Sequence, residues 1–482
     1  MAHRLLNFVS KYETWLVDEF ALAPVGSSEM LQPVGGVRGT SSPGSSANPL
    51  YLEESWMSTP TLEQLAATVS ASGTLSVTAF YFWSIALMIL IHAGFLAYEM
   101  GASRTKNVLA SAVKNILAFT LIVPTMFYFG WWIYLALPNG FIPIDAGTAG
   151  LPWNAHMGPN LADPFNGVFW AVFVLFSATT ASILSGAAIE RVKISAFAIL
   201  AIVLGSGVWM LAAAWGWSPT GWMLTKLGFH DAGAAGVVHE VAGFFTLGVL
   251  INLGARIGKF GPNGEIKEIR PHNIPMTVVG LMLIIAGFFG FMAGCVIYNA
   301  DGTMTDIYSN PTNLAAWLFN ILMGFAGGAL GSYVIAREPF WMMSGGLAGI
   351  ISIASGVNVY YPGLAYLIGM AGGALGPIIA KMVERFRIDD PVGAVTVHGI
   401  CGLWSVVAVG IFAAGYPNVG GPSISLGGQV IGAVVLAVMG FVPGYAVSYA
   451  LKAMGALRVG SEVEMKGLDP VEIPMSAYDS QV

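Results

Sequence analysis

DAGAAGVVHEVAG (residues 231–243) and DPVGAVTVHGICG (residues 390–402) are two copies of one pattern in a very apolar chain. Each copy begins with an Asp and carries a His eight residues later, His239 in the first and His398 in the second. Polar side chains are costly inside a bilayer, and an intramembrane His is therefore a candidate functional residue. Two of them on matched helices predict one pore or binding site that an internal repeat builds.

Composition places the whole chain in a membrane. Its 482 residues are 56% hydrophobic and only 10% charged, with a mean hydropathy of +0.71, whereas soluble domains carry roughly 25% charged residues. This predicts an all-α polytopic membrane protein surrounded by lipid. No basic cluster suits nucleic acid. The two cysteines, Cys295 and Cys401, are too widely spaced for a zinc site and are expected to be small buried residues, so no metal or cofactor is predicted.

Three regions follow from the distribution of apolar residues. Residues 1–75 form an extracellular N-terminal extension with a Gly/Ser-rich linker, residues 76–452 form the membrane domain, and residues 453–482 form a cytoplasmic tail. A spanning helix needs about 20 mostly apolar residues. Eleven stretches qualify, near residues 76–98, 108–137, 167–189, 193–217, 232–254, 274–299, 312–335, 342–358, 361–383, 391–414 and 425–452.

Lys and Arg residues set the expected orientation. Three of the 20 precede residue 76, and sixteen of the remaining seventeen lie at or beside alternate connections, with only Lys226 on the other side. Because positive residues favour the cytoplasm, the sequence predicts a multi-pass plasma membrane protein with its N-terminus outside and its C-terminus in the cytoplasm. Helices one to five and six to ten then form a five-plus-five inverted repeat, and the eleventh helix is extra.

The two patterns begin at opposite faces of the membrane. Asp231 is expected to cap the fifth helix at its external end, and Asp390 to cap the tenth at its cytoplasmic end, where each could also add negative potential. Eight residues of helix rise about 12 Å, so both imidazoles reach the centre of a hydrocarbon core about 30 Å thick. Imidazole can donate or accept a hydrogen bond and pass a proton. A facing pair suits a small polar solute that crosses partly as a neutral species.

Several motifs resemble the Amt/Mep/Rh ammonium transporter family, in the family's order and over roughly residues 76–470. Besides the two His segments, they are RTKNVLA (104–110), GAAIERVKIS (186–195) and the tail LRVGSEVEMKGLD (457–469). The tail and the Trp-rich approach to the fifth helix favour the Amt branch over the Rh branch.

This resemblance implies a homotrimer with one pore in each protomer, external recruitment of ammonium, a phenylalanine constriction and a twin-His channel. His239 and His398 would be the twin His, and Phe176 and Phe291 the gate. The recruitment wall would be Trp217 or Trp222, since an ammonium ion is attracted to an aromatic face. The spacing leaves that choice open.

The sequence departs from the family pattern in three places. Cys295 stands where the family often has a recruitment-site Ser, and a thiol is a weaker hydrogen-bond partner, so external affinity is expected to be lower. Met292 replaces a polar residue. In the tail, Glu472-Ile473-Pro474 stands where the family has Glu-His-Gly, so coupling between protomers or to a PII-type regulatory protein could differ.

Three alternatives accompany the leading hypothesis of a transporter that carries net charge as ammonia plus a relayed proton. One is a passive channel for ammonia or carbon dioxide, which would generate no current. Another is an ammonium sensor acting through a separate partner, because only about 30 residues follow residue 452. A membrane enzyme is disfavoured, since the sequence has no metal-ligand spacing or nucleophile motif. Packing or hydrogen bonding is expected of His92, Glu99 and Glu240, three further polar residues in predicted helices.

Overall fold

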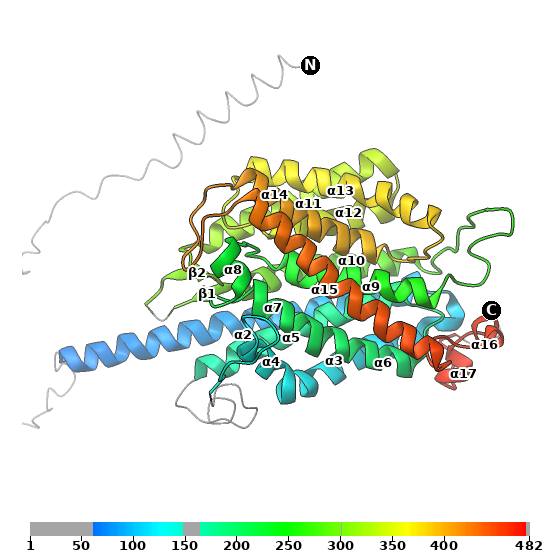
Figure 1. Cartoon of the computed structure of the whole chain (residues 1–482), viewed down its shortest axis with the longest axis horizontal. Coiled ribbons are helices and arrows are strands. Elements are labelled where there is room, and N and C mark those ends of the chain that lie inside the picture. The colour runs from blue at the N-terminus through cyan, green and yellow to red at the C-terminus, as the bar shows by residue number, and fades with distance from the viewer. Residues whose placement is uncertain (1–60, 148–163, 300, 479–482) are drawn as a thin grey trace, which may run out of the picture. The chain divides into compact units, whose positions relative to one another are not determined.

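Long apolar helices packed side by side build the computed structural model, which describes residues 61–147, 164–299 and 301–478 (Figure 1). In hydrocarbon every backbone N–H must be satisfied within the chain, and an apolar run therefore forms a helix. The first half contains α2 (Leu62–Ala102), α3 (Val108–Thr125), α4 (Trp131–Ala136), α5 (Pro164–Ala187), α6 (Ile194–Ile202), α7 (Met210–Gly216), α8 (Trp222–Leu227) and α9 (Val241–Leu253). The second half contains α10 (Ile274–Gly294), α11 (Leu314–Ala336), α12 (Pro339–Ala354), α13 (Pro362–Arg385), α14 (Cys401–Phe412) and α15 (Leu426–Ala453), followed by α16 (Ser461–Lys466) and α17 (Asp469–Glu472) in the tail.

Shorter elements complete the description. A 3-10 turn, η1 (Thr105–Asn107), precedes α3, and four π-helical turns, η2 (Met126–Gly130), η5 (Val203–Trp209), η6 (Ala235–Glu240) and η7 (Val395–Ile400), interrupt or begin longer helices. Two three-residue strands, β1 (Val296–Tyr298) and β2 (Met304–Asp306), pair antiparallel with Ile297 opposite Thr305. Apart from this small ribbon, the regular secondary structure of the described residues is helical, and the all-α prediction is confirmed.

The described residues contain ten helical segments long and apolar enough to cross a membrane. The remaining apolar helix, α12, has 16 residues and rises only about 24 Å, less than the hydrocarbon thickness of about 30 Å. It ends at Ala354, which is fully buried, because the chain turns there inside the protein. The predicted span at residues 342–358 is therefore a shorter helix, and the count of eleven spans is not confirmed.

The first helix is longer than the sequence analysis expected. It begins at Leu62 rather than near residue 76, and a capping box between Thr61 and Gln64 starts it. Residues 62–75 are helix-forming but only moderately apolar, and most of their side chains are exposed. A search for apolar runs therefore missed this amino-terminal part of α2.

Glycines let the first helices of the two halves approach closely. A Cβ on Gly94 of α2 would lie 2.6 Å from Ile284 of α10, and one on Gly280 would lie 2.3 Å from the backbone N of Tyr98. Small residues at such crossings allow backbones to touch in membrane proteins. The buried core lies between this helix pair, α5, α9 and the η6 and η7 turns.

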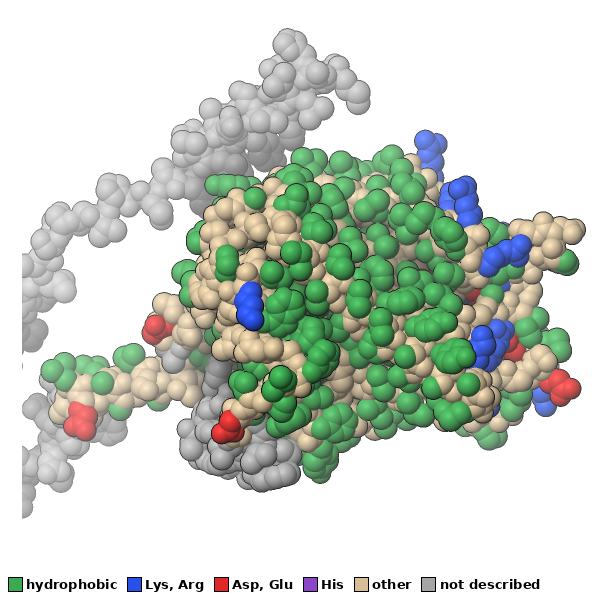
Figure 2. Space-filling view, in the orientation of Figure 1, with side chains coloured by type: hydrophobic (Ala, Val, Ile, Leu, Met, Phe, Trp, Pro, Cys, Tyr) green, Lys and Arg blue, Asp and Glu red, His purple; other side chains and the backbone are tan. Residues whose placement is uncertain are grey.

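Positive side chains gather at one end of the molecule, beside the C-terminal tail, while hydrophobic side chains cover most of the face between the ends (Figure 2). This end, named here the basic end, carries Arg104, Arg191 and Arg256 together with α16 and α17. The connections that the Lys and Arg distribution assigned to one side of the membrane lie together at this basic end.

Candidate functional site

The two pattern histidines touch at the centre of the helix bundle. His239 in η6 and His398 in η7 have their Nδ1 atoms 3.0 Å apart. Their rings stack with centroids 5.2 Å apart and planes 21° from parallel. Both side chains are buried. The two halves of the chain therefore contribute one histidine each to a single polar site, the histidine pair, in otherwise apolar surroundings.

Aspartates start both histidine-bearing segments. One carboxylate oxygen of Asp231 accepts hydrogen bonds from the backbone N–H groups of Gly236 and Val237, both at 2.9 Å. Asp390 uses both of its oxygens, with Oδ1 accepting from the N–H of Ala394 at 3.0 Å and Oδ2 from that of Val395 at 2.8 Å. These bonds satisfy N–H groups that a helix start leaves unpaired. The cap positions themselves hold Ala234 and Ala394, so each Asp acts from further upstream than a simple N-cap.

The first of these segments is also tied to the second half of the chain. The backbone N–H groups of Ala232 and Gly233 donate to the carbonyls of Ser355 and Ala354, at 3.0 and 2.9 Å. The Ser355 hydroxyl donates to Asp231 at 2.7 Å. The end of α12 thus supplies partners for the loop that positions His239.

Both histidines lie in π-helical turns, which recur at functional sites because the extra residue changes side-chain direction. The backbones cross closely here. A Cβ on Gly243 would stand 2.1 Å from the backbone N of Gly399, and one on Gly402 would stand 2.6 Å from that of Glu240. Glycines at both crossings let the two rings meet.

Phenylalanines cover one side of the histidine pair. Phe176 and Phe291 meet edge to face with centroids 4.4 Å apart. The ring centroid of Phe291 also lies 5.7 Å from that of His239, and the Phe288 ring stacks on the same imidazole with centroids 5.6 Å apart. Sequence reasoning missed Phe288, although it lies one helical turn before Phe291 in the same GFFGF stretch.

The two tryptophans considered for recruitment lie in different places. Trp217 is buried, meets Phe176 edge to face at 5.0 Å, and donates from its indole N–H to the Ala232 carbonyl at 3.3 Å. Trp222 packs against Trp215 instead, at 5.6 Å. The structure therefore brings Trp217, and not Trp222, against the phenylalanine pair.

The cysteines are both free and buried, as expected. Cys295 lies one turn beyond Phe291 and donates from its thiol to the Phe291 carbonyl at 3.3 Å. Among the described residues, no group of three or more His, Cys, Asp or Glu side chains could hold a metal ion.

His92, Glu240 and Glu99, for which packing or hydrogen bonding was expected, have different surroundings. His92 meets Phe119 edge to face at 5.3 Å, and its Nε2 has no hydrogen-bond partner in the described ranges. Glu240 is fully buried, and neither carboxylate oxygen has a partner there. Of the two roles expected, packing and hydrogen bonding, Glu240 therefore shows only packing within this part of the chain. Glu99, by contrast, is hydrogen-bonded to two other helices.

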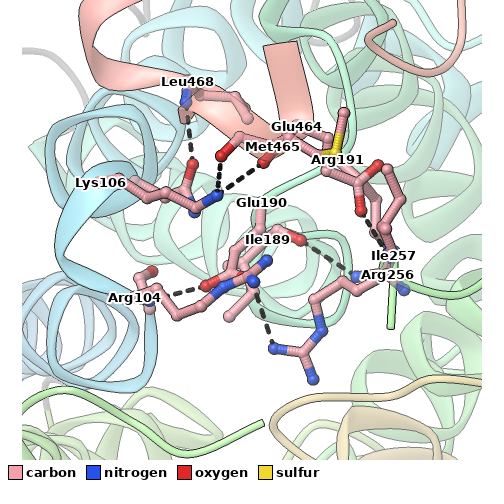
Figure 3. Close-up of polar contacts among 12 residues, drawn as sticks. Arg104, Lys106, Ile189, Glu190, Arg191, Arg256, Ile257, Glu464, Met465 and Leu468 are labelled. Carbon is pink, nitrogen blue, oxygen red and sulfur yellow. Dashed lines mark hydrogen bonds and ion pairs between the residues drawn. The ribbon is translucent and has the colours of Figure 1, made fainter. Parts of the chain in front are cut away.

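Ion pairs organise the basic end. Glu190 pairs with Arg104 at 2.6 Å and with Arg256 at 3.7 Å (Figure 3). Burial alone would raise the pKa of Glu190, but Arg256 and Arg104 outweigh it and hold that pKa below its usual value. Asp389 is likewise buried, yet Arg191 and Arg256 lower its pKa far below the usual range. Both carboxylates therefore stay ionised near neutral pH.

The tail docks on this cluster. Lys106 donates to the backbone carbonyls of Glu464 and Met465, and the N–H of Leu468 donates to Asn107 at 2.9 Å (Figure 3). Glu464 accepts from the N–H of Ile257 at 2.7 Å and pairs with Arg458 at 2.7 Å. The tail is thus held by the connections after α2 and α9.

The family model described as Ammonium Transporter Family matches residues 79–478. The chain belongs to this family. It is 30% identical to ammonium transporter Amt1 of Methanocaldococcus jannaschii, over 83% of this chain and 97% of that protein. It is 32% identical to Amt2 of the same organism, over 86% of this chain and 94% of that protein. A solved structure titled Sensor Amt Protein aligns with a TM-score of 0.71 and 26% identity, covering 82% of this chain and 98% of that one.

Proposed function

We propose that this family member moves ammonium across the membrane through the histidine pair, as ammonia plus a relayed proton. Membership of a transport family and the apolar helices make it a multi-pass membrane protein related to ammonium transporters. The observation that carries the mechanism is the contact of His239 with His398 at 3.0 Å, between the two halves of the chain.

The aromatic residues above the pair support an order of events. Trp217, next to Phe176, offers a π-face that attracts an ammonium ion. Phe176 and Phe291 then form the gate, which a desolvated cation passes less readily than neutral ammonia. His239 and His398 accept and pass the proton, because neutral imidazole has one acceptor and one donor nitrogen. Cys295 and the negative potential of Asp231 assist recruitment.

The surroundings of the pore complete the proposal. The basic end faces the cytoplasm of a plasma membrane protein, since positive residues concentrate there. Each protomer of a homotrimer holds one pore. A PII-type regulatory protein would act at the docked tail. These assignments come from the family resemblance and the charge distribution.

The deciding test is ammonium-evoked current in proteoliposomes. The native protein is expected to give a saturable current that falls about a hundredfold in His239→Ala and in His398→Ala, the low end of what a proton-transfer group contributes. His92→Ala is the matched control, because His92 is also buried in a helix but packs against Phe119. Currents in His239→Ala and His398→Ala as large as the current in His92→Ala and in the native protein would refute the proposal.

A sensor is the second candidate function, because a solved relative is titled Sensor Amt Protein. A sensor would bind ammonium at the same aromatic residues and histidines without continuous flux. Ammonium-dependent tryptophan fluorescence from native protein that carries neither current nor ammonia would favour it. Ammonia flux without current would favour the gas channel instead.

A further inference from the structure

A buried carboxylate lies on the basic-end side of the histidine pair. Glu99, near the end of α2, is fully buried. Its Oε2 accepts a hydrogen bond of 2.8 Å from Asn115 of α3, and its Oε1 accepts one from Ser185 of α5. Each carboxylate oxygen has two lone pairs, so each retains a site for a proton.

Glu99 and His398 line the same small cavity. Its volume is about 20 Å³, enough for one molecule the size of water or ammonia. The other lining residues are mostly apolar, and Glu99 is the one acidic side chain among the described residues that line it. Among the other lining residues, Tyr98 and Val392 lie toward the basic end of the molecule.

A second charge accompanies the carboxylate. Lys114 precedes Asn115 on α3, is fully buried, and acts electrostatically on Glu99. Its ammonium group has no hydrogen-bond partner in the part of the chain that the structure describes. Ionisable groups at such depth are rare and mark ion or proton pathways. A nearby cation compensates the negative charge of Glu99 before a proton arrives.

The far side of the cavity is closed by aromatic stacking. The Tyr98 ring lies 6.2 Å from that of Phe340, at 16°, and its hydroxyl donates to the Val392 carbonyl at 3.1 Å. Phe340 in turn lines an open pocket of about 560 Å³ at the basic end, together with Arg256 and Asp389. The stacked Tyr98 and Phe340 rings therefore stand between the cavity that Glu99 and His398 line and this pocket.

Building on the proposed twin-His function, we propose that Glu99 accepts the relayed proton and returns it to ammonia. The N–H bond of a protonated His398 breaks as an O–H bond forms on Glu99, which leaves neutral imidazole and a carboxylic acid. Ammonia then takes that proton, so the O–H bond breaks, a fourth N–H bond forms, and ammonium and carboxylate result. No other reactant is consumed.

The alternative role is a brace, because Glu99 joins α2 to α3 and α5. The variants Glu99→Gln and Glu99→Asp separate the two roles: the amide keeps the size and most hydrogen bonds but not the proton site, while the shorter acid keeps the proton site. Glu240→Gln is the matched control, since Glu240 is equally buried but is not among the residues that line this cavity.

The experiment measures two quantities in proteoliposomes, ammonium-evoked current and ammonia entry followed as internal alkalinisation. Glu99→Gln is expected to lose current about a hundredfold while ammonia entry and thermal stability stay near native. Glu99→Asp should recover much of the current, and Glu240→Gln should keep it.

Three results would overturn this role for Glu99. Native current in Glu99→Gln rejects the relay but leaves the proposed transport intact. Joint loss of current, ammonia entry and thermal stability in Glu99→Gln identifies a brace. Absence of current in native protein rejects the proposed transport, and the relay with it.

Discussion

In the proposed mechanism, single residues at the entrance set how tightly ammonium is held. The Cys295 thiol lies one turn from Phe291 and donates to its carbonyl, which leaves the sulfur as the group that this mechanism offers to an arriving cation. Sulfur is a weak acceptor, whereas a hydroxyl oxygen is a good one. This residue is therefore the place where one substitution should tighten recruitment.

Replacing Cys295 with Ser should raise the apparent affinity for ammonium. A better hydrogen bond to a cation contributes about 1 kcal/mol, which corresponds to roughly a fivefold lower half-saturating concentration. Current measured against ammonium concentration checks this, with Cys401→Ser as the control at a buried cysteine on α14. An unchanged or higher half-saturating concentration would exclude Cys295 from the recruitment site.

Much of the site could be predicted residue by residue, and the exceptions have clear reasons. The repeated Asp and His spacing identified both histidines because their depth follows from helical rise. The choice between Trp217 and Trp222 depended on how the chain turns between α7 and α8, which spacing does not specify. Phe288 and Glu99 were not selected because packing or hydrogen bonding was the default for such residues. Only the tertiary structure places Phe288 against His239 and Glu99 on a cavity that His398 also lines.

At the level of elements, the crossing of α9 with η7 sets the distance between the histidines. Gly243 has no room for a methyl group, since a Cβ there would stand 2.1 Å from the Gly399 backbone. Backbone cannot move aside as a flexible side chain can. A larger residue must push η7 away and carry His398 with it.

The variant Gly243→Ala should therefore abolish most current and lower thermal stability by about 1–3 kcal/mol, the usual cost of overpacking. Gly427→Ala is the control, because a Cβ there would meet nothing within 4 Å. Current assays and melting curves of both variants provide the check. Native current in Gly243→Ala would mean that the crossing tolerates separation and that the contact of the two rings is dispensable.

The tail is a second element whose contacts make a prediction. Glu464 is buried and accepts from the Ile257 N–H, whereas Glu462 on the same helix is exposed. Glu464→Gln should release the tail and speed tryptic cleavage roughly tenfold, the loss expected for a charge-assisted hydrogen bond. Glu462→Gln is the matched control. Equal cleavage of both variants would show that Glu464 does not hold the tail.

Truncation after Lys452 extends this test to function. If the docked tail couples protomers or receives a regulatory protein, its removal should change the current or its regulation. Unchanged transport and regulation in the truncated protein would remove the tail from the mechanism.

At the scale of the whole molecule, the charge distribution predicts the orientation. Lys226 lies at the end away from the tail, while Lys452 precedes the tail, and both are exposed. A membrane-impermeant maleimide should label Lys226→Cys in intact cells and Lys452→Cys only after permeabilisation. The two native cysteines are buried and contribute little background. The reverse labelling pattern would invert the proposed direction of transport.

The overall fold was more predictable than its details. Apolar runs identify membrane helices because hydrocarbon forces backbone pairing within each segment. They do not report where a helix ends inside the protein, as α12 does at Ala354, or where a helix extends through a less apolar stretch, as α2 does from Leu62. Both ends are set by neighbours and capping rather than by hydropathy.

The hydrogen bonds from Ala232 and Gly233 to the end of α12 join the two halves of the chain beside the histidine pair. A carrier that works by alternating access must move its halves apart in each cycle, and here that motion would break those bonds in the buried interior of the protein. Two halves joined by these hydrogen bonds are suited to a fixed passage instead. Transport should then follow the electrochemical gradient without a rocking step. A covalent crosslink between the two segments should leave the transport rate unchanged.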